Sequence, residues 1–484
     1  MKLGRKSAVL FVVILVSLLG GALRIYRLDR ESLWLDEGAS VKVARMDLVP
    51  LLRQSAVESY SPFYNTLLHF WIKAFGDSAE SVRMMSVLFG ALAIFAIFVA
   101  GREWFGAETG LLSCLLLSCS AFNVRYSQEA RGYTLALFLT LLSYYFFRRM
   151  ERIGNGPEKA SGPGKLAPLA YLAINILLVF SHPYGVFIIL AQNLYFFSLK
   201  VLAPGRISWP VRNWLLVQTP LLVVTLAWVL VMAYTSRKNP GVFWIPRPDL
   251  MSLFITLWYQ AGSRQLILLF GLLVILSLLT VGPRKVTPGP GPGPVFAVLL
   301  WLIVPVLAPF VFSLWFTPIF HFRYTILASP ALCLLAAQGI GNLHYRVLKW
   351  PVAALAIALS LISTKEYFST FHKAQWREAV DFLEHRALPG DILIFHQGYT
   401  ICNIYDYYAK RKDLAKVPFP DLEGEIDAEN ISKLDQLIQG RDRVWVVISY
   451  SQGDELLLFK KLEQSYSNIY QKTFVGIDVY MCEN

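Results

Sequence analysis

Long apolar runs separated by short polar loops dominate residues 1–364. A run of about 18 or more apolar residues is typical of a helix that spans a membrane, and the ends of shorter runs extend into adjoining loops. The apolar runs cover residues 7–23, 82–100, 109–123, 132–147, 167–181, 184–199, 213–233, 265–281, 295–314, 325–343 and 351–363. The pattern therefore predicts a polytopic α-helical membrane protein with about eleven transmembrane helices.

The loop charges predict how these helices are oriented. The first run follows a basic stretch and lacks a small-residue cleavage site, so we expect it to remain as the first span. Lysine and arginine gather in the loops after the fourth, sixth, eighth and tenth runs, which the positive-inside rule assigns to the cytoplasm. These charges predict a multi-pass protein of the plasma (inner) membrane, with a cytoplasmic N-terminus and an extracytoplasmic C-terminal tail.

Several arginines do not fit this bias, because they fall on the predicted outer side. Either the topology differs, or these side chains bind anions at the outer surface. They are Arg24, Arg27, Arg125, Arg131, Arg237, Arg247 and Arg323.

Two regions outside the spans have patterns of their own. The first outer loop, 24–81, contains two amphipathic stretches, 48–57 and 62–75, which predict short interfacial helices. From residue 365 onward, strand-like and helix-like stretches alternate, which predicts a small α/β domain. The predicted elements are helices at 373–387, 399–410 and 455–464, strands at 391–396 and 443–450, and a final β-hairpin. We therefore divide the chain into a transmembrane domain, 1–364, and an extracytoplasmic α/β domain, 365–484.

Composition supports a membrane protein and excludes some other classes. Of the 484 residues, 55% are hydrophobic and only 16% are charged, whereas charged residues make up about 25% of typical soluble domains. The net charge of +12 comes largely from short loops, and no basic patch interleaved with aromatic residues predicts a nucleic-acid partner. Cys402 and Cys482 lie in the tail, where they either pair or remain free thiols.

Polar residues concentrate at four junctions that the topology places on the outer side. A carboxylate at the edge of a bilayer and near arginines is a candidate general base. If the four junctions share one face, they form a candidate active site. The junctions are Asp36-Glu37, 125–133, 181–184 and 321–324, and their candidate pocket residues are Tyr64, Tyr126, Gln128, Glu129, His182, Tyr184 and His321.

Each junction also has a structural explanation. Asp36 and Glu37 are also consistent with an acidic pair at a helix N-terminus, which the helix dipole favours, or with ordinary solvated loop charges. Glu129 and Arg131 are also consistent with a local ion pair, and Arg323 with snorkelling to the interface. His182 and His321 are the only candidates for a divalent metal, and their spacing is not that of a metal site. We therefore assign no metal and no required cofactor, and leave divalent-cation dependence open.

The motifs at these junctions resemble those of a known superfamily. They are Asp36-Glu37, Ser61-Pro62-Phe63-Tyr64, Phe75-Gly76-Asp77-Ser78, Tyr126–Tyr133, Ser181–Gly185 and Phe322-Arg323-Tyr324. Together they are similar to motifs of the dolichyl-phosphate-mannose protein mannosyltransferase superfamily (glycosyltransferase family 39-like), to which the aminoarabinose lipid A transferases are related. The resemblance covers roughly residues 8–345. One departure is Ser61-Pro62-Phe63, where many relatives have His-Pro-Pro.

The resemblance implies a GT-C fold and a sugar donor joined to a polyprenyl phosphate. It implies Asp36 as the base that deprotonates an acceptor hydroxyl, with Glu37 as its support. It also implies that Arg131, Arg323 and Tyr324 bind the lipid phosphate. Direct displacement would invert the anomeric centre, and the hexosyl or pentosyl group would pass to a protein, lipid or glycan. A Gly-rich phosphate loop is not needed, and the sequence contains none.

Two other functions account for part of the pattern. A polytopic transporter or lipid flippase predicts charges deep within spans, whereas most charges here fall at span ends. An assembly scaffold would explain the tail as a docking module, but would leave the polar outer junctions unexplained.

Overall fold

The computed structural model describes residues 2–56, 61–155, 166–205, 207, 209–238, 245–279, 292–421, 424–451 and 453–484. Contacts divide the chain into two compact units. The helical unit comprises Met1–Tyr26, Asp47–Ala74 and Val82–Ser369, and the α/β unit comprises Arg27–Met46, Phe75–Ser81 and Thr370–Asn484. The α/β unit therefore joins two stretches of the predicted first outer loop to the C-terminal part of the chain.

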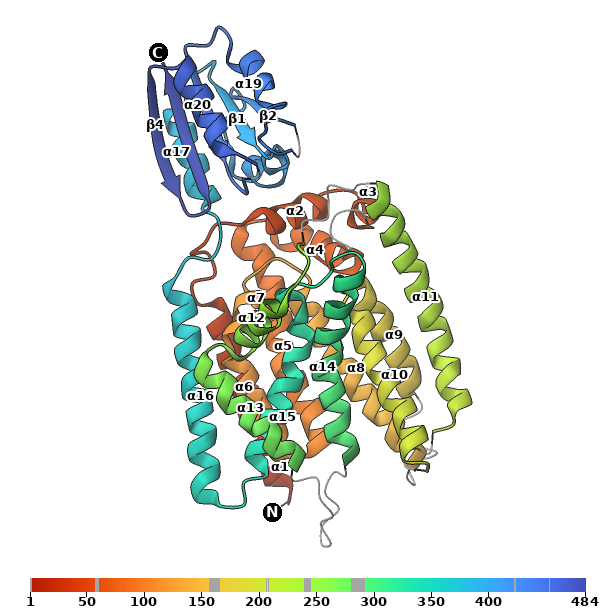
Figure 1. Ribbon diagram of the computed structural model, residues 1–484. Helices are drawn as coiled ribbons and strands as arrows, with labels where there is room; N and C mark the ends of the chain where they lie inside the picture. Colours follow the sequence, from red (N-terminus) through yellow and green to blue (C-terminus); the bar gives the residue numbers. More distant parts are fainter. Residues whose placement is uncertain are drawn as a thin grey trace. The chain divides into compact units, whose positions relative to one another are not determined.

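The helical unit is a bundle with α3 and α4 at one end and the N-terminus at the other (Figure 1). Its helices are α1 (Lys2–Ile25), α3 (Leu48–Gln54), α4 (Pro62–Phe75), α5 (Ala79–Phe105), α6 (Ala107–Ser118), α7 (Ala121–Ser127), α8 (Tyr133–Asn155), α9 (Ala167–Ser181), α10 (Gly185–Leu202), α11 (Val211–Lys238), α12 (Leu250–Ala261), α13 (Arg264–Leu279), α14 (Pro292–Trp315), η5 (Phe322–Ala328), α15 (Ser329–Gly341) and α16 (Arg346–Ser369).

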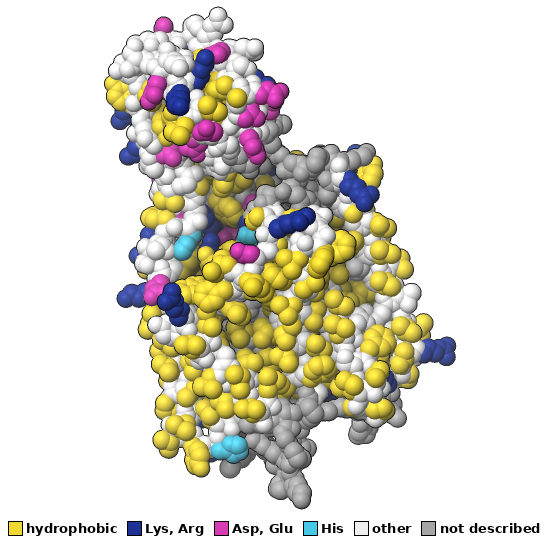
Figure 2. Space-filling model, in the orientation of Figure 1, with side chains coloured by type: hydrophobic (Ala, Val, Ile, Leu, Met, Phe, Trp, Pro, Cys, Tyr) yellow, Lys and Arg dark blue, Asp and Glu magenta, His cyan; other side chains and the backbone are white. Residues whose placement is uncertain are grey.

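Each of the eleven predicted spans coincides with a helix or with consecutive helices of this unit, and residues 280 and 281 of the span predicted at 265–281 lie outside the described residues. Among the described residues, seven helices are long and apolar enough to cross a membrane, and two bent helix pairs, α6–α7 and α12–α13, raise the number to nine. The other two predicted spans lie on α8, whose second half carries several arginines, and on α9, which has 15 residues. Apolar side chains cover the flank of this unit, as a lipid-facing surface requires (Figure 2). The predicted polytopic α-helical class is confirmed.

Local sequence explains where α12 begins and why it bends into α13. Asp249 caps α12, since its carboxylate accepts a hydrogen bond from the Ser252 amide at 2.9 Å. The helix ends at Gly262, whose φ of +100° is left-handed and therefore favours glycine. The two helix axes consequently meet at 88°.

Arg24 is a structural residue of the bundle, which corrects its grouping with anion-binding arginines. Its side chain is 1% exposed. The guanidinium donates to the carbonyls of Gly20, Leu117 and Ser118 and to the Ser127 hydroxyl at 2.9–3.1 Å. A buried arginine whose donors are used in this way holds helices together.

The α/β unit has a five-stranded sheet with the strand order β2-β1-β3-β5-β4. Its elements are α2 (Leu35–Ala44), α17 (Trp376–Arg386), β1 (Ile392–His396), η6 (Ile401–Tyr405), α18 (Asp406–Tyr408), β2 (Ala415–Phe419), α19 (Ile431–Ile438), β3 (Arg443–Ile448), α20 (Glu455–Ser465), β4 (Asn468–Phe474) and β5 (Ile477–Glu483). Strand β1 is parallel to β2 and β3, whereas β5 is antiparallel to β3 and β4.

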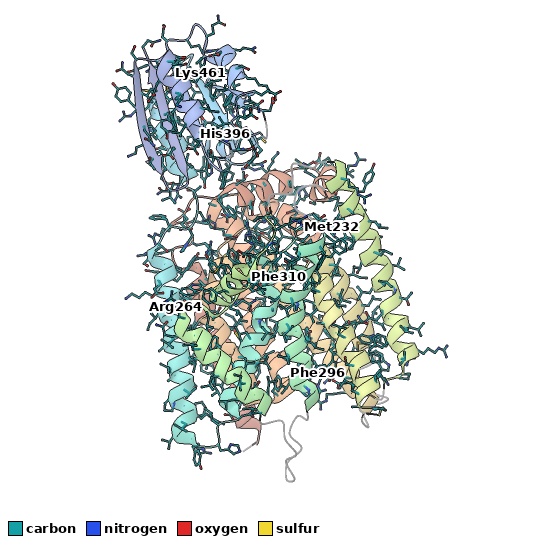
Figure 3. The ribbon with its side chains drawn as sticks, in the orientation of Figure 1. Met232, Arg264, Phe296, Phe310, His396 and Lys461 are labelled. Atoms are coloured by element: carbon teal, nitrogen blue, oxygen red, sulfur yellow. The ribbon has the colours of Figure 1, made fainter. Side chains whose placement is uncertain are left out.

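Helices cover both faces of this sheet. Ile394 and Val446 share a core with Leu434 of α19 and Leu458 of α20. On the other face, Phe382 of α17 contacts Trp445, with ring centroids 6.1 Å apart. Figure 3 shows His396 at the end of β1 and Lys461 on α20; the His396 side chain is 1% exposed. Burial on both faces explains why β1 and β3 are continuous apolar runs rather than alternating ones.

The predicted α/β domain is confirmed, with differences in detail. The final hairpin, the strands at β1 and β3 and the helices at α17 and α20 lie where predicted. The predicted helix 399–410 is instead the π-helical turn η6 followed by the three-residue α18. The pattern did not predict β2, a short edge strand that contains Pro418, or α19. Cys402 and Cys482 are both free thiols.

Candidate active site

Three of the four predicted junctions meet within the helical unit. We call the group that they form the bundle-end cluster. Aromatic contacts link the junctions directly, and all the linked residues come from the ends of α7, α8, α9 and η5. The cluster comprises Arg125, Tyr126, Arg131, Tyr133, His182, Tyr184, His321, Arg323 and Tyr324.

Tyr324 is the centre of this cluster. Its ring centroid lies 5.0 Å from that of His182, 5.4 Å from Tyr184 and 5.6 Å from His321. The Tyr133 ring is 6.3 Å away. The predicted candidates from the 181–184 and 321–324 junctions are therefore side by side, although more than 130 residues separate them.

Three arginines act on the two histidines of the cluster. Burial, followed by the charges of Arg131 and Arg323, lowers the pKa of His182 to about 3. Burial, followed by the charges of Arg323 and Arg125, lowers the pKa of His321 to about 3. Both imidazoles are therefore neutral at physiological pH, because a second positive charge is disfavoured beside these guanidinium groups.

The hydrogen bonds of both histidines select one neutral tautomer. Nδ1 of His182 accepts from the Tyr184 amide at 3.2 Å. Nδ1 of His321 accepts from the Arg323 amide at 3.3 Å and from Arg323 Nε at 3.2 Å. Since Nδ1 is the acceptor, the ring proton of each histidine is on Nε2, which is a donor. The cluster thus combines cationic and neutral donors, a composition that suits an anion.

Gln128 and Tyr64, the two uncharged pocket candidates outside the cluster, form contacts between neighbouring helices. Gln128 donates to the carbonyls of Arg24 and Tyr26 at 2.9 and 2.8 Å, and accepts from the Tyr367 hydroxyl at 2.9 Å. It therefore ties the end of α1 to α16 and the 125–133 junction. The Tyr64 hydroxyl lies 3.4 Å from the Ser86 hydroxyl.

Glu129 is the acidic member of the 125–133 junction. Its side chain is buried, and its charge acts on Arg125 and Tyr126. A carboxylate close to Arg125 reduces the net positive charge of the site without removing its donors.

The fourth junction, Asp36-Glu37, lies in the α/β unit. Both carboxylates occupy the first turn of α2, where the helix dipole favours acidic residues. Glu37 is fully buried, and its Oε2 atom pairs with Lys373 Nζ at 3.0 Å. Asp36 is partly exposed, and burial and then the charge of Asp36 raise the pKa of the Tyr450 phenol. The two carboxylates therefore have different environments, with Glu37 in a buried ion pair and Asp36 beside Tyr450.

Sequence reasoning missed two residues of these sites, Lys373 and Tyr450. Arg125 and Tyr133 were included in the predicted 125–133 junction, but neither was given a specific role in the site. Lys373 and Tyr450 are more than 300 positions from their partners in α2, and no local pattern could have indicated that pairing.

Among the described residues, no group of three or more His, Cys, Asp or Glu side chains could hold a metal ion. For His182 and His321, the Nε2–H tautomer also leaves no lone pair on Nε2 for a metal.

Residues 59–157 match the family described as dolichyl-phosphate-mannose-protein mannosyltransferase. The matched segment includes Tyr64 and the whole 125–133 junction. No curated protein matches the chain.

Solved structures share the fold at low sequence identity. ArnT from Cupriavidus metallidurans in the apo state aligns with a TM-score of 0.62 and 15% identity, covering 97% of each chain. The same protein bound to undecaprenyl phosphate gives 0.61 and 14%, again covering 97% of each chain. The Archaeoglobus fulgidus oligosaccharyltransferase AglB, in complex with an inhibitory peptide and a dolichol-phosphate, gives 0.57 and 13% and covers 98% of this chain and 74% of its own.

The structural alignments extend over both units of the chain. The family match is shorter and covers residues 59–157, which include the 125–133 junction. The chain has the fold of the GT-C membrane glycosyltransferases and resembles the dolichyl-phosphate-mannose-protein mannosyltransferase superfamily, as its junction motifs predict.

Proposed function

We propose that this protein is an integral-membrane glycosyltransferase. It transfers a hexosyl or pentosyl group from a polyprenyl-phosphate donor to an acceptor hydroxyl at the outer face of the plasma (inner) membrane. The observation that carries the proposal is the bundle-end cluster, which combines three arginines with two neutral histidine donors on a GT-C fold. The solved relative with undecaprenyl phosphate supports a lipid-phosphate donor.

The reaction is a single displacement. The acceptor oxygen forms a bond to the anomeric carbon while the bond from that carbon to the phosphate oxygen breaks. The polyprenyl phosphate leaves with the bonding electron pair, and the acceptor proton passes to Asp36. The anomeric centre is inverted, because attack occurs opposite the leaving group.

Each part of the protein contributes one element of this reaction. Arg131 and Arg323 stabilise the charge that develops on the departing phosphate, and Tyr324 lies between the two histidine donors. Asp36 is the general base, and Glu37 supports it from the same helical turn. The mechanism requires Asp36, Arg131 and Arg323 to face one sugar from the outer side, with the N-terminus in the cytoplasm.

The test is turnover by the purified protein in detergent. Radiolabelled polyprenyl-phosphate sugars, each with a panel of lipid, glycan and peptide acceptors, should give a product of inverted configuration with at least one pair. A transporter or flippase has no activity without two compartments, so turnover in detergent excludes that alternative. Reporter fusions that place residue 36 in the cytoplasm would contradict the proposal.

A further inference from the structure

The C-terminal part of the chain holds the helix that carries Asp36. The first contact is the ion pair between Lys373 and Glu37, whose side chains are 6% and 0% exposed. The same Glu37 oxygen accepts the Trp34 amide at 3.4 Å, so one carboxylate joins Lys373 to the start of α2. A buried charge is stable only while its partner is present, because neither group is solvated by water.

The second contact is a close approach of two backbones. A Cβ atom added to Gly38 would lie 2.0 Å from the carbonyl oxygen of Asn403 in η6 and 3.0 Å from the Ile404 side chain. One turn further along α2, Lys42 Nζ donates to Asn403 Oδ1 at 3.1 Å. One face of α2 therefore packs directly on η6, and only glycine permits this distance.

The chain that leads into α2 is held by the same part of the protein. The Leu33 amide donates to the Tyr408 hydroxyl at 2.6 Å, and the Ser32 hydroxyl donates to Glu378 at 3.0 Å. These contacts immobilise the residues just before Asp36 on the elements α17 and α18.

Asp36 lies within this set of contacts. The next two residues, Glu37 and Gly38, are the points at which α2 is fastened, so a small movement of either moves the Asp36 carboxylate. Tyr450, which follows β3 and has a left-handed φ of 56°, lies near Asp36. A non-glycine residue in this conformation costs energy and persists only where its surroundings hold it.

We propose that the C-terminal α/β part is a positioning platform for the catalytic carboxylate, and that Lys373 is its principal positioning residue. This inference rests on the proposed function, in which Asp36 is the base. It gives residues 370–484 a role in the reaction itself, through the geometry of α2.

The test compares Lys373→Met with Lys433→Met in the whole purified protein. Lys433 also forms an ion pair in the α/β unit, at 2.9 Å from Asp421, but both side chains are exposed. Lys373→Met should lower kcat about 100-fold, the cost of a small misplacement of a catalytic group. KM for the donor should change little, and Lys433→Met should behave as the wild type.

Hydrogen exchange provides a readout that is independent of turnover. In Lys373→Met, amides of residues 35–44 should exchange about tenfold faster, while those of β1 and β3 should be unchanged. Adding Glu37→Gln should restore part of both kcat and protection, because the unpaired buried charge is removed. Unchanged exchange in Lys373→Met, or faster exchange with unchanged kcat, would overturn the platform.

A second variant tests the η6 contact without changing charge. Gly38→Ala should reproduce the loss of kcat, because its Cβ displaces α2 from Asn403. Gly271→Ala in α13 is the matched control, since a Cβ there meets nothing within 4 Å. Wild-type kcat in Gly38→Ala would contradict the proposal.

The two proposals can fail separately. If Asp36→Asn remains active while Lys373→Met and Gly38→Ala are impaired, the assignment of the base is wrong and the platform acts through another group of α2. If Asp36→Asn is inactive while both platform variants are normal, the base stands and the platform is refuted.

Discussion

The bundle-end cluster and the carboxylate pair of α2 are built in opposite ways. The cluster sits at the ends of apolar helices, and its histidines stay neutral because burial and arginines oppose protonation. The pair sits on a short helix of the α/β unit, where Lys373 compensates the buried Glu37. An anion-binding site needs donors that do not titrate, whereas a base needs a carboxylate that stays exposed enough to accept a proton. The two environments therefore suit the two parts of the proposed displacement, which are stabilisation of the leaving phosphate and removal of the acceptor proton.

Asp36→Asn should impair only the removal of the acceptor proton. We expect kcat to fall by about 10³-fold or more, since general-base catalysis contributes about 10²–10⁴-fold. Binding of polyprenyl phosphate should be unchanged, as measured by equilibrium titration of the purified protein. Asp421→Asn, at an exposed ion pair of the same unit, is the control. Loss of lipid-phosphate binding in Asp36→Asn would contradict the assignment of separate roles to the two regions.

Arg131→Gln and Arg323→Gln should impair the binding and the departure of the lipid phosphate. Each should weaken lipid-phosphate binding and lower kcat/KM by about 10²–10³-fold, because a donor to the developing charge is lost. Arg264→Gln, an exposed arginine at the start of α13 (Figure 3), is the control. Normal donor affinity in both cluster variants would contradict a phosphate site at the bundle end.

Acid should destabilise the helical unit through its histidines. Their pKa is about 3 in the folded protein and 6.5 when unperturbed. The unfolded chain therefore binds protons first, so stability is complete above pH 6.5 and is lost as pH falls toward 3. At pH 5 each histidine should cost about 2 kcal/mol. The measurement is the thermal midpoint at pH 7.5 and 5, and His182→Gln should show a smaller acid shift than the wild type.

Gly132→Ala should have the smallest effect. An added Cβ would lie 2.9 Å from the Ser181 carbonyl oxygen and 3.3 Å from Tyr64 Cβ, so the 125–133 junction must shift. We expect a loss of about 1–3 kcal/mol, as for other overpacked sites, measured by thermal unfolding against Gly271→Ala. A wild-type thermal midpoint in Gly132→Ala would contradict this prediction, because it would show that the 125–133 junction can shift without loss of stability.

The agreement between sequence and structure was uneven. The helix predicted at 62–75 is α4, with the same bounds, and every predicted span coincides with a helix or with consecutive helices. The α/β class also followed from alternation, but β2 and α19 were missed, because a five-residue edge strand with a proline has little pattern.

The candidate site was predictable as a set of residue types and not as an arrangement. Tyr126, His182, Tyr184, His321, Arg323 and Tyr324 were identified as polar groups at span ends. Ring contacts join the aromatic members, with Tyr133 linking Tyr126 to the others, and Arg323 donates a hydrogen bond to His321. Arg24 had the same local appearance and is instead a buried tie between helices.

By itself, the sequence determined the membrane-spanning helices, the terminal α/β region and the residues available for chemistry. These follow from hydropathy and periodicity, which are local properties of the chain. Only the tertiary structure decided which histidine nitrogen carries the proton, that Glu37 pairs with Lys373 across 336 positions, and that η6 requires a glycine at position 38. Those outcomes depend on burial and on contacts between distant segments, and no window of sequence contains both partners.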